Sequence, residues 1–494
     1  MRKMKENACN NKNQKKNPGF LLSAVSSNSG KTAAACGLMS AFKQTGKRVC
    51  ACKCGPDYID PMFHREVLSV DSKNLDLFFS EEEVLKEEYL RHTKDADITI
   101  TEGVMGFYDG MSLGSVKGSS YDVARTLGLP VILVINARGA AMTLVATVKG
   151  IAEFRSDSKI RGILLNRVSA MLYPRLKEML ENELARIGHD EIKIVGYMPE
   201  NEVFHLESRH LGLVTPQQME NLQEKVKRAG EILAKTVDLE LLEKIAGEAA
   251  VWKTEVIEES EKVGNLKSKN DPVRIAVARD EAFCFYYKDN LELLESLGCE
   301  LIEFSPLHDK KLPKNVKGIL LGGGYPELYG KELAENQSML ESIRRALNNK
   351  IPCLAECGGF MYLHEEMEDA DGNVWKLVGR IHGKTFPTGK LVRFGYVNLQ
   401  RNLDENQVSE LKERMSIADS WILPGENIRA HEFHYWDSTD SGSDCLAVKP
   451  DGKRKWECIH MEENLVAGYP HLYYLSCKEF AERFVEKCRS GYRE

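Results

Sequence analysis

The most informative stretch of this sequence is Ile351-Pro352-Cys353-Leu354-Ala355-Glu356-Cys357-Gly358-Gly359, an apolar run that ends at a cysteine and two glycines. The pattern predicts a buried strand that turns sharply into a helix at Cys357, a geometry known as a nucleophile elbow. Such a turn lifts the sulfur out of the backbone, and the N-terminus of the following helix favours its thiolate. Cys357 is therefore the candidate nucleophile of a thiol hydrolase. Cys353 lies within the predicted strand and is expected in the core.

The N-terminal half contains a phosphate-binding pattern, Ser26-Ser27-Asn28-Ser29-Gly30-Lys31-Thr32. It follows a predicted strand, Phe20 to Val25, and precedes a segment with helical character, Ala33 to Gln44. In that context backbone amides and the helix N-terminus bind phosphate, Lys31 offsets its charge and the Thr32 hydroxyl can ligate magnesium. Val25 replaces the first glycine of the usual G-x-x-x-x-G-K-T pattern, but the position between strand and helix favours a nucleotide site over a chance match.

Length and composition indicate the number of domains and the kinds of partner to expect. The 494 residues predict two or three domains, and a hydrophobic fraction of 43% with 29% charged residues is ordinary for globular protein. A net charge of -7 gives no electrostatic reason to expect nucleic acid or an anionic membrane as partner. The sequence shows no apolar run of membrane-spanning length and no signal-peptide core. We therefore expect a cytoplasmic protein; a homodimer is left open.

The cysteine content raises the question of a metal site. The sequence has 13 cysteines, but they show none of the paired spacings typical of metal ligands. Cys50, Cys52 and Cys54 alternate along a predicted strand and so share one face. We interpret them as buried small apolar side chains in a reducing compartment.

Strand and helix patterns alternate in both halves of the chain, which indicates α/β folds and, in the first half, a doubly wound parallel sheet. The apolar strands predicted in the first half are residues 20–25, 98–101, 130–135 and 162–165. Before the elbow, the second half shows a strand at 273–278, a helix at 289–297, a strand at 318–321 and a helix at 332–348.

The domain limits follow from a change in composition. From about residue 238 the chain becomes helical and charged, and it ends in Lys267-Ser268-Lys269-Asn270-Asp271-Pro272. We predict a disordered tail at 1–17, a P-loop domain at 18–250, a linker at 251–271 and a second α/β domain at 272–494.

Two acidic clusters can serve the phosphate loop. Glu102 ends an apolar strand, and in open α/β sheets ligands gather at the carboxyl ends of strands. The loop Lys53 to Pro61 adds a lysine and two acids, Asp57 and Asp60. Either cluster alone is typical of a solvated turn, but with the phosphate loop they predict a site for metal, phosphate and substrate.

From about residue 19 to 485 the sequence resembles the cobyrinic acid a,c-diamide synthase family, dethiobiotin-synthetase-like amidoligases fused to a class I glutaminase domain. The resemblance implies a flavodoxin-like α/β fold for the C-terminal glutamine amidotransferase domain. It rests on the stretches 53–64 (KCGPDYIDPMFH), 74–76 (NLD), 102–110 (EGVMGFYDG), 166–168 (NRV), 209–213 (RHLGL), 282–283 (AF) with 286–287 (YY), 322–327 (GGGYPE) and 431–435 (HEFHY).

The resemblance implies an ATP- and glutamine-dependent amidation of the a and c acetate side chains of a corrinoid, through an acyl phosphate. It places Gly30 and Lys31 on the ATP phosphates and Asn166 on adenine. It implies Thr32, Asp60 and Glu102 as ligands of Mg²⁺. The residues that would line the carboxylate-activation site are Lys53, Asp57, Tyr58 and Asp109.

The glutaminase half requires a base for Cys357. His471 is favoured by the resemblance, and His434 in the cluster His431-Glu432-Phe433-His434 is the rival. Ordinary class I glutaminases carry a glutamate two residues after the histidine, where this sequence has Tyr473, so a Cys-His dyad is implied. The resemblance also makes Gly323 and Gly324 an oxyanion loop, although a simple tight turn would show the same glycines.

A nucleotide site and a thiol hydrolase site on one chain indicate glutamine hydrolysis that supplies an ATP-driven amidation of a corrinoid acid, in cobalamin biosynthesis. One alternative changes the tetrapyrrole to nickel-sirohydrochlorin or hydrogenobyrinic acid. A second alternative is a non-catalytic partitioning-type regulatory ATPase. Ser26 disfavours it, because those proteins carry a second lysine there and lack a Cys-elbow domain.

Overall fold

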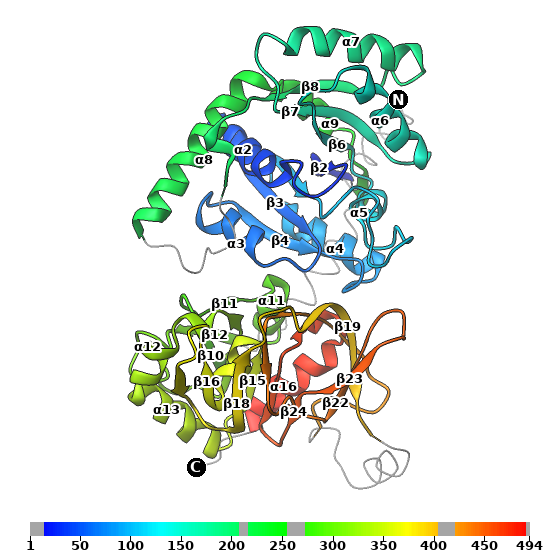
Figure 1. The fold of residues 1–494 in the computed structure, drawn as a ribbon. Helices are drawn as coiled ribbons and strands as arrows, with labels where there is room; N and C mark the ends of the chain where they lie inside the picture. The colour runs from blue at the N-terminus through cyan, green and yellow to red at the C-terminus, as the bar shows by residue number, and fades with distance from the viewer. Residues whose placement is uncertain (1–13, 207–215, 254–271, 404–419, 491–494) are drawn as a thin grey trace, which may run out of the picture. The chain divides into compact units, whose positions relative to one another are not determined.

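The computed structural model describes residues 14–206, 216–253, 272–403 and 420–490. The chain divides into two compact units, residues 1–261 and 262–494, each an α/β fold (Figure 1). The division falls inside the predicted linker, whose limits stay a prediction because residues 254–271 lie outside the described part. Within the predicted tail and linker, β1 (Gln14–Lys16) and β9 (Val251–Lys253) differ from expectation, since they pair as antiparallel strands.

The N-terminal unit contains the predicted doubly wound sheet. Seven strands run in the order β4-β3-β5-β2-β6-β7-β8, and every neighbouring pair is parallel. The strands are β2 (Gly19–Ala24), β3 (Val49–Cys54), β4 (Asp71–Leu75), β5 (Ile98–Glu102), β6 (Val131–Asn136), β7 (Ile160–Asn166) and β8 (Lys193–Met198). All residues of β2 and β5 are buried, as expected for strands covered on both faces. Cys50, Cys52 and Cys54 are buried in β3, as predicted.

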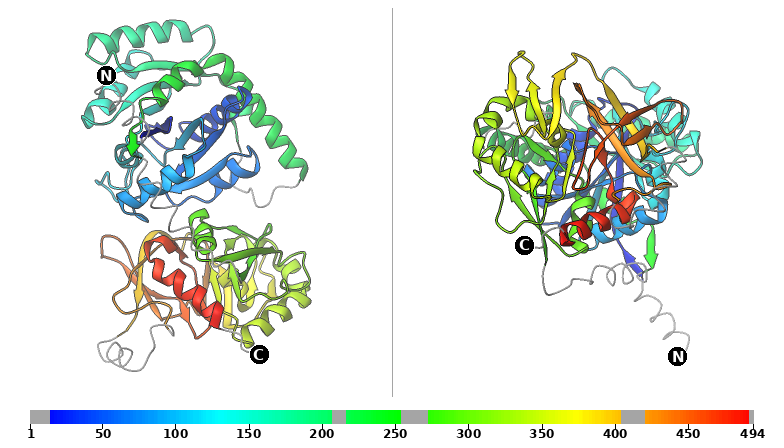
Figure 2. Two further views of the ribbon diagram at one scale, coloured as in Figure 1. Left: turned by 180° about the vertical axis from the view of Figure 1, so that it is seen from behind. Right: turned by 90° about the horizontal axis from the view of Figure 1, so that it is seen from below.

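Helices cover the two faces of this sheet (Figure 2). The helix after the phosphate loop, α2, packs against α8. The helices are α2 (Lys31–Gln44), α3 (Ile59–Glu66), α4 (Glu82–Thr93), α5 (Ser120–Leu127), α6 (Met142–Phe154), α7 (Tyr173–Arg186), α8 (Pro216–Thr236) and α9 (Leu239–Ala246), with the 3-10 helix η2 (Glu202–Phe204). In neither unit do the described residues form a helix long and apolar enough to cross a membrane.

The C-terminal unit is built on a six-stranded sheet in the order β12-β10-β13-β15-β25-β24. Its first five strands are parallel and only β24 is antiparallel. Numbered along the chain, the parallel strands follow the order 2-1-3-4-5, which is the flavodoxin-like order implied by the resemblance. The strands are β10 (Val273–Ala278), β12 (Cys299–Phe304), β13 (Gly318–Leu321), β15 (Cys353–Glu356), β24 (His460–Met461) and β25 (Leu465–Gly468).

The helix predicted at 332–348 is wrong as a single element, because the structure has two helices there. Asn336 separates them, since its side-chain amide donates to the carbonyls of Pro306 and Asp309, both at 2.8 Å. These bonds hold the backbone of Asn336 outside helical geometry, at φ -79° and ψ 58°. The helices of this unit are α11 (Lys288–Ser296), α12 (Gly330–Glu335), α13 (Gln337–Asn348), α14 (Gly358–Tyr362) and α16 (Lys478–Ser490), with 3-10 helices η4 (Pro326–Leu328) and η6 (Tyr474–Ser476).

Three smaller sheets complete the C-terminal unit. An antiparallel sheet runs β23-β22-β19-β20-β26, a four-stranded sheet runs β17-β16-β18-β21, and β11 pairs with β14. Their strands are β11 (Phe283–Phe285), β14 (Gly323–Gly324), β16 (His364–Glu368), β17 (Val374–Lys376), β18 (Ile381–Pro387), β19 (Arg393–Arg401), β20 (Ile428–His434), β21 (Trp436–Ser438), β22 (Cys445–Val448), β23 (Lys455–Cys458) and β26 (His471–Leu472). The pairing of β26 with β20 sets His471 opposite His431.

Candidate functional site

The phosphate loop joins β2 to α2 and is held by a residue from a distant strand. Gly30 adopts φ 92°, and a Cβ atom there would lie 2.4 Å from Nδ2 of Asn166. Asn166, at the end of β7, donates from Nδ2 to the carbonyl of Ser29 at 2.9 Å. Position 30 therefore requires glycine for its conformation and for the close approach of Asn166.

Lys31 begins α2 with its amine directed at backbone carbonyls of the loops around it. Its Nζ donates to the carbonyl of Ser26 at 3.2 Å and to that of Met105 at 2.5 Å. Burial, and then the positive charge of Lys53, lower the pKa of Lys31 to about 8. A bound anion would favour the charged form of this lysine, which is the behaviour expected of a phosphate ligand.

The acids predicted for the metal meet at the carboxyl ends of β3 and β5. Glu102, the last residue of β5, is fully buried, and Thr32 donates from Oγ1 to its Oε1 at 2.7 Å. Lys53 lies opposite Glu102 in the strand register and donates to the same oxygen at 2.8 Å. Asp60, in the first turn of α3, forms a second ion pair with Lys53. The structure thus gathers Thr32, Lys53, Asp60 and Glu102 into one cluster, of which Lys53, Asp60 and Glu102 are buried.

The charges in this cluster shift one another strongly. Burial alone would lower the pKa of Lys53, but the attraction of Asp60 and Glu102 raises it well above its usual range. Burial raises the pKa of Asp60 to about 7, against the attraction of Lys53. Burial likewise opposes ionisation of Glu102, yet Lys53 and His64 together hold the pKa of Glu102 well below its usual range. The carboxyl of Glu102 is therefore ionised more readily than that of Asp60.

His64 completes the cluster and was not assigned a role from the sequence. Its Nε2 lies 3.6 Å from Oε2 of Glu102, and its Nδ1 lies 3.0 Å from Oγ of Ser72. Within the described part of the chain, Oε2 of Glu102 accepts no hydrogen bond. A buried carboxylate oxygen with no donor is an available ligand position for a cation.

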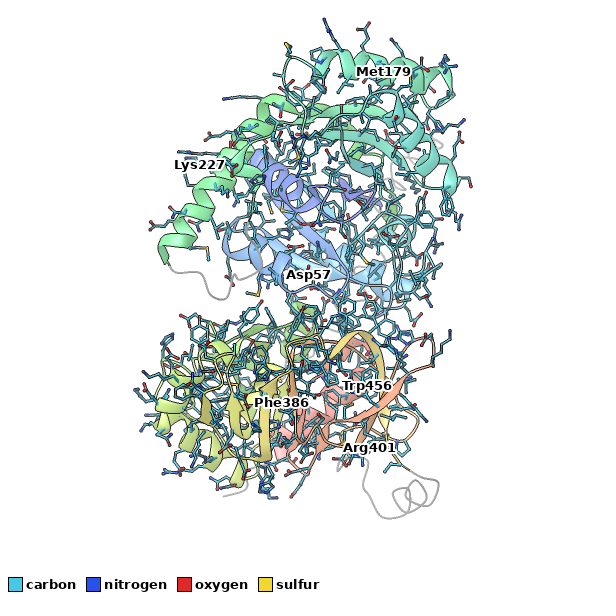
Figure 3. The ribbon with its side chains drawn as sticks, in the orientation of Figure 1. Asp57, Met179, Lys227, Phe386, Arg401 and Trp456 are labelled. Carbon is cyan, nitrogen blue, oxygen red and sulfur yellow. The ribbon has the colours of Figure 1, made fainter. Side chains whose placement is uncertain are left out.

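The residues predicted to face the substrate lie on the loops around this cluster. Asp57, labelled in Figure 3, accepts at Oδ1 from the backbone N–H of Ile59 at 2.8 Å. Tyr58 stands at the N-cap position of α3 and is half-buried. Asp109 is exposed and accepts from the backbone N–H of Gly106 at 2.9 Å. Both carboxylates thus fix their own loops, and the ammonium of Lys53 contacts Asp60 and Glu102 instead of an open surface.

A pocket opens beside the phosphate loop in the same unit. It is bordered by the loop on one side and by the segment after β8 on the other. Its lining combines polar and apolar side chains. The lining residues are Asn28, Gly30, Ala33, Asn166, Arg167, Met198, Pro199, Glu200, Asn201, Phe204 and His205.

In the C-terminal unit the predicted strand-turn-helix at Cys357 is present. Cys357 adopts φ 49° and ψ -102° between β15 and α14, and its N–H donates to the carbonyl of Gly468 at 2.8 Å. A Cβ atom at Gly359 would lie 2.2 Å from the carbonyl oxygen of Leu321, so only glycine permits α14 to approach β13. The left-handed backbone of Cys357 is the strained turn that defines an elbow.

The predicted effect of the helix N-terminus on the Cys357 thiol is present, but burial outweighs it. Burial, reinforced by the charge of Glu327, raises the pKa of the Cys357 thiol well above its usual range, and the backbone N–H of Gly358 opposes the shift only in part. The helix has five residues, too few for a large dipole effect. The thiol therefore needs a neighbouring base.

His471 lies next to the glycine loop that was predicted to bind the oxyanion. A Cβ atom at Gly323 would lie 2.3 Å from Cε1 of His471, and one at Gly358 would lie 3.1 Å from the backbone nitrogen of Gly324. The loop thus contacts the elbow on one side and the His471 ring on the other. Burial, and then His431 and His434, lower the pKa of His471 to about 3, so its imidazole is neutral.

The rival base, His434, has both ring nitrogens engaged. Its Nδ1 lies 2.7 Å from the carbonyl of Trp436, and its Nε2 lies 3.1 Å from Oε2 of Glu432. The ring also stacks on Tyr469 with centroids 3.9 Å apart. Since neither nitrogen is left to receive a thiol proton, His434 has the contacts of a structural residue.

Comparisons with known proteins cover both sites. The CobQ/CobB/MinD/ParA nucleotide binding domain model matches residues 21–214, and the CobB/CobQ-like glutamine amidotransferase domain model matches residues 274–478. A cobyrinate a,c-diamide synthase from Caldanaerobacter subterraneus subsp. tengcongensis is 37% identical over 95% of this chain and 98% of its own length. The chain belongs to the cobyrinate a,c-diamide synthase family.

Other members of the cobyrinate a,c-diamide synthase family match to a similar extent. The Clostridium tetani enzyme is 39% identical over 95% of this chain and 99% of its own length. The Priestia megaterium enzyme is 34% identical over 97% and 98%. Among solved structures, a glutamine amidotransferase aligns with 44% of this chain and 98% of its own length. The TM-score is 0.30 at 15% identity, so the likeness is slight.

Two side-chain contacts of this family member were not predicted from the sequence. Tyr473, at the position of the class I glutamate, donates its hydroxyl to Oδ2 of Asp289 at 2.9 Å. Glu356, the residue before the nucleophile, has Oε2 3.9 Å from Nδ1 of His471. The only signal in the sequence was its position, directly before Cys357. The stretch Arg209 to Leu213, which supported the resemblance, lies outside the described residues.

Proposed function

We propose that this chain uses ATP to amidate the a and c acetate carboxylates of cobyrinic acid, with ammonia released from glutamine. The observation that carries the proposal is a phosphate loop with a buried acid cluster and a cysteine elbow with a neutral histidine on one chain. The relatives named cobyrinate a,c-diamide synthase, which match over nearly their whole length, support the corrinoid over the other tetrapyrroles. They equally disfavour a regulatory ATPase.

The phosphate loop and Lys31 would hold the ATP phosphates, and the pocket beside Gly30 and Asn166 would take adenine. The oxygen donors of Thr32, Asp60 and Glu102 fit Mg²⁺, which prefers hard oxygen ligands, and the bare Oε2 of Glu102 leaves one position open. When bound there, Mg²⁺ would offset the negative charge of the phosphates. Lys53 contributes by keeping Asp60 and Glu102 together before any cation binds.

The synthetase reaction proceeds in two steps in this proposal. An acetate oxygen of the corrinoid attacks the γ-phosphorus, forming an acyl phosphate and releasing ADP. Ammonia then attacks the acyl carbon and expels inorganic phosphate. Asp57, Tyr58 and Asp109, on the loops that surround the acid cluster, would position the carboxylate and the incoming ammonia. Lys31 stabilises charge on the transferred phosphoryl group.

The glutaminase reaction begins when His471 removes the proton of the Cys357 thiol. The thiolate attacks the amide carbon of glutamine, and the loop of Gly323 and Gly324 receives the oxygen that becomes negative. His471 gives its proton to the departing nitrogen, so ammonia leaves and a thioester remains. Water then hydrolyses the thioester to glutamate and restores the thiol.

We place the reaction in the cytoplasm. All twelve cysteines among the described residues are free and buried, as expected of a protein kept in a reducing compartment.

A substrate panel tests this proposal. Purified protein is incubated with ATP, glutamine and cobyrinic acid, hydrogenobyrinic acid or nickel-sirohydrochlorin, and products are identified by mass spectrometry. We expect the diamide of cobyrinic acid to form with the highest kcat/KM. Preferential amidation of either other tetrapyrrole would reassign the substrate, and no amidation of any would refute the proposal.

A further inference from the structure

An acid lies beside the elbow, in the 3-10 helix that follows the glycine loop. This helix, η4, packs against α14, the helix of the elbow. A Cβ atom at Gly358 would lie 2.9 Å from Cδ of Pro326, the residue directly before Glu327. Burial raises the pKa of the Cys357 thiol most, and among the charged groups Glu327 raises it most. Glu327 therefore belongs to the surroundings of the nucleophile.

Glu327 differs from the other two acids that raise the pKa of the thiol. Glu432 accepts a hydrogen bond from Trp456 at 3.2 Å, and Glu356 accepts one from Tyr474 at 3.0 Å. Among the described residues, no side chain donates to the carboxyl of Glu327, and only its own backbone N–H does. Burial raises the pKa of Glu327 to about 7, because no cation opposes the effect. A cation that bound beside it would favour its ionised form.

Tyr469 supplies a buried donor near the same nucleophile. Its side chain is 5% exposed, and its ring packs edge-to-face on Phe360 and parallel to His434, with centroids 4.9 Å and 3.9 Å away. No described residue forms a hydrogen bond with its hydroxyl, which is rare for a buried polar group. After burial, the charge of Cys357 raises the pKa of Tyr469 most, and Glu327 raises it too. The fold itself thus leaves this hydroxyl without an acceptor.

The two groups match the end of glutamine that does not react. Besides its amide, free glutamine carries an α-ammonium and an α-carboxylate, and both must find partners when they leave water. A carboxylate without a cation suits the ammonium, and a hydroxyl without an acceptor suits the carboxylate.

We propose that Glu327 and Tyr469 select glutamine by its amino-acid end, with the Glu327 carboxylate binding the α-ammonium and the Tyr469 hydroxyl donating to the α-carboxylate. The inference rests on the proposed glutaminase function and adds the groups that recognise its substrate. Neither residue makes or breaks a bond. The bound ammonium also offsets the negative charge that opposes the Cys357 thiolate, so glutamine itself favours the reactive form of the nucleophile.

The test measures ammonia release by the full-length protein from glutamine and from two analogues. Glutaramate lacks the α-ammonium, and 4-aminobutanamide lacks the α-carboxylate. The wild type should prefer glutamine over each analogue by about 10²-fold in kcat/KM. Glu327→Gln should lower the preference over glutaramate by about 10-fold, and Tyr469→Phe should do the same for 4-aminobutanamide. Each variant should leave the other preference unchanged.

Tyr362→Phe and Glu332→Gln are the matched controls. Tyr362 also has a buried hydroxyl with no partner in the described part of the chain, but after burial its pKa is shifted by Asp280 and Arg344. Glu332 is an exposed acid on the next helix, α12. Both controls should keep the wild-type preferences.

The outcomes that would overturn the assignment are distinct. Equal use of glutamine and glutaramate by the wild type would refute the role of Glu327, even if the variants failed to fold. Unchanged preferences in Glu327→Gln and Tyr469→Phe would refute the proposal as a whole. Failure of the proposed function gives another result. The stated preferences without corrinoid amidation would overturn only the tetrapyrrole substrate, whereas no ammonia release from glutamine would overturn the glutaminase function itself.

Discussion

Gly323→Ala is the substitution whose consequence follows most directly from the geometry. The added Cβ would lie 2.3 Å from Cε1 of His471, whereas ordinary contacts are 3.4–4 Å, so the ring or the loop must move by about 1 Å. His471 is held in β26, and Gly323 is paired with Phe285 of β11, so either movement disturbs the catalytic arrangement. A misplacement of about 1 Å costs roughly 10²-fold in rate.

The assay compares glutaminase kcat with amidation driven by free ammonium. We expect Gly323→Ala to lose about 10² in glutaminase kcat while the ammonia-dependent reaction stays at wild-type rate, and to lose about 1–3 kcal/mol of stability from overpacking. Gly389→Ala is the matched control. It also loses about 1–2 kcal/mol, because φ is 66°, but its Cβ meets no atom within 4 Å. If Gly323→Ala keeps wild-type glutaminase, or if Gly389→Ala loses it equally, the placement of His471 beside this loop is wrong.

Three further predictions concern the two half-reactions. Cys357→Ser should abolish glutamine-dependent amidation and leave ammonia-dependent amidation intact, measured as diamide formed; no rescue by ammonium would contradict two separable sites. Lys31→Ala and Glu102→Gln should each lower amidation by about 10²-fold or more with either nitrogen source, because they act on phosphate and metal; near-normal ammonia-dependent turnover in either would disprove that role. His471→Asn should slow labelling of Cys357 by an electrophilic glutamine analogue, whereas His434→Asn should leave labelling unchanged unless the unit unfolds; the reverse pattern would exchange the two assignments.

The phosphate loop and the elbow were predictable because each is a continuous pattern in the chain. Gly30, Lys31 and Thr32 are adjacent, and Cys357 follows directly on its strand. The strand, the tight turn and the helix of such a pattern are encoded by neighbouring residues, so their local structure can be predicted from the sequence.

The acid cluster was predictable only in part. The sequence placed Glu102 at a strand end and Lys53 on a loop, whereas Lys53 lies within β3. The direct opposition of Lys53 and Glu102 depends on β3 lying beside β5, although β4 comes between them in the chain. His64 joins Glu102 from α3, and no periodicity indicates that contact. Strand order is a property of long-range packing, so these pairings became visible only in the folded chain.

The missed residues have the same explanation. The helix at 332–348 was predicted as one element because the backbone carbonyls that bind Asn336 come from residues 306 and 309. The approach of Glu356 to His471 was not predicted, because the sequence shows only that Glu356 precedes Cys357. That approach depends on β15 lying beside β25, which brings the segment after Gly468 to the elbow.

The central claim is that nitrogen released at Cys357 replaces an oxygen of a carboxylate activated by ATP. One experiment follows both atoms: cobyrinic acid with ¹⁸O-labelled a and c carboxylates, ATP and amide-¹⁵N glutamine are incubated with the wild-type protein. Mass spectrometry of the corrinoid and of inorganic phosphate then reads out the products. The account predicts ¹⁵N in both new amides and one ¹⁸O transferred to phosphate for each amidation. Glutamine hydrolysis without ¹⁵N in the corrinoid, or amidation without ¹⁸O in phosphate, would contradict it.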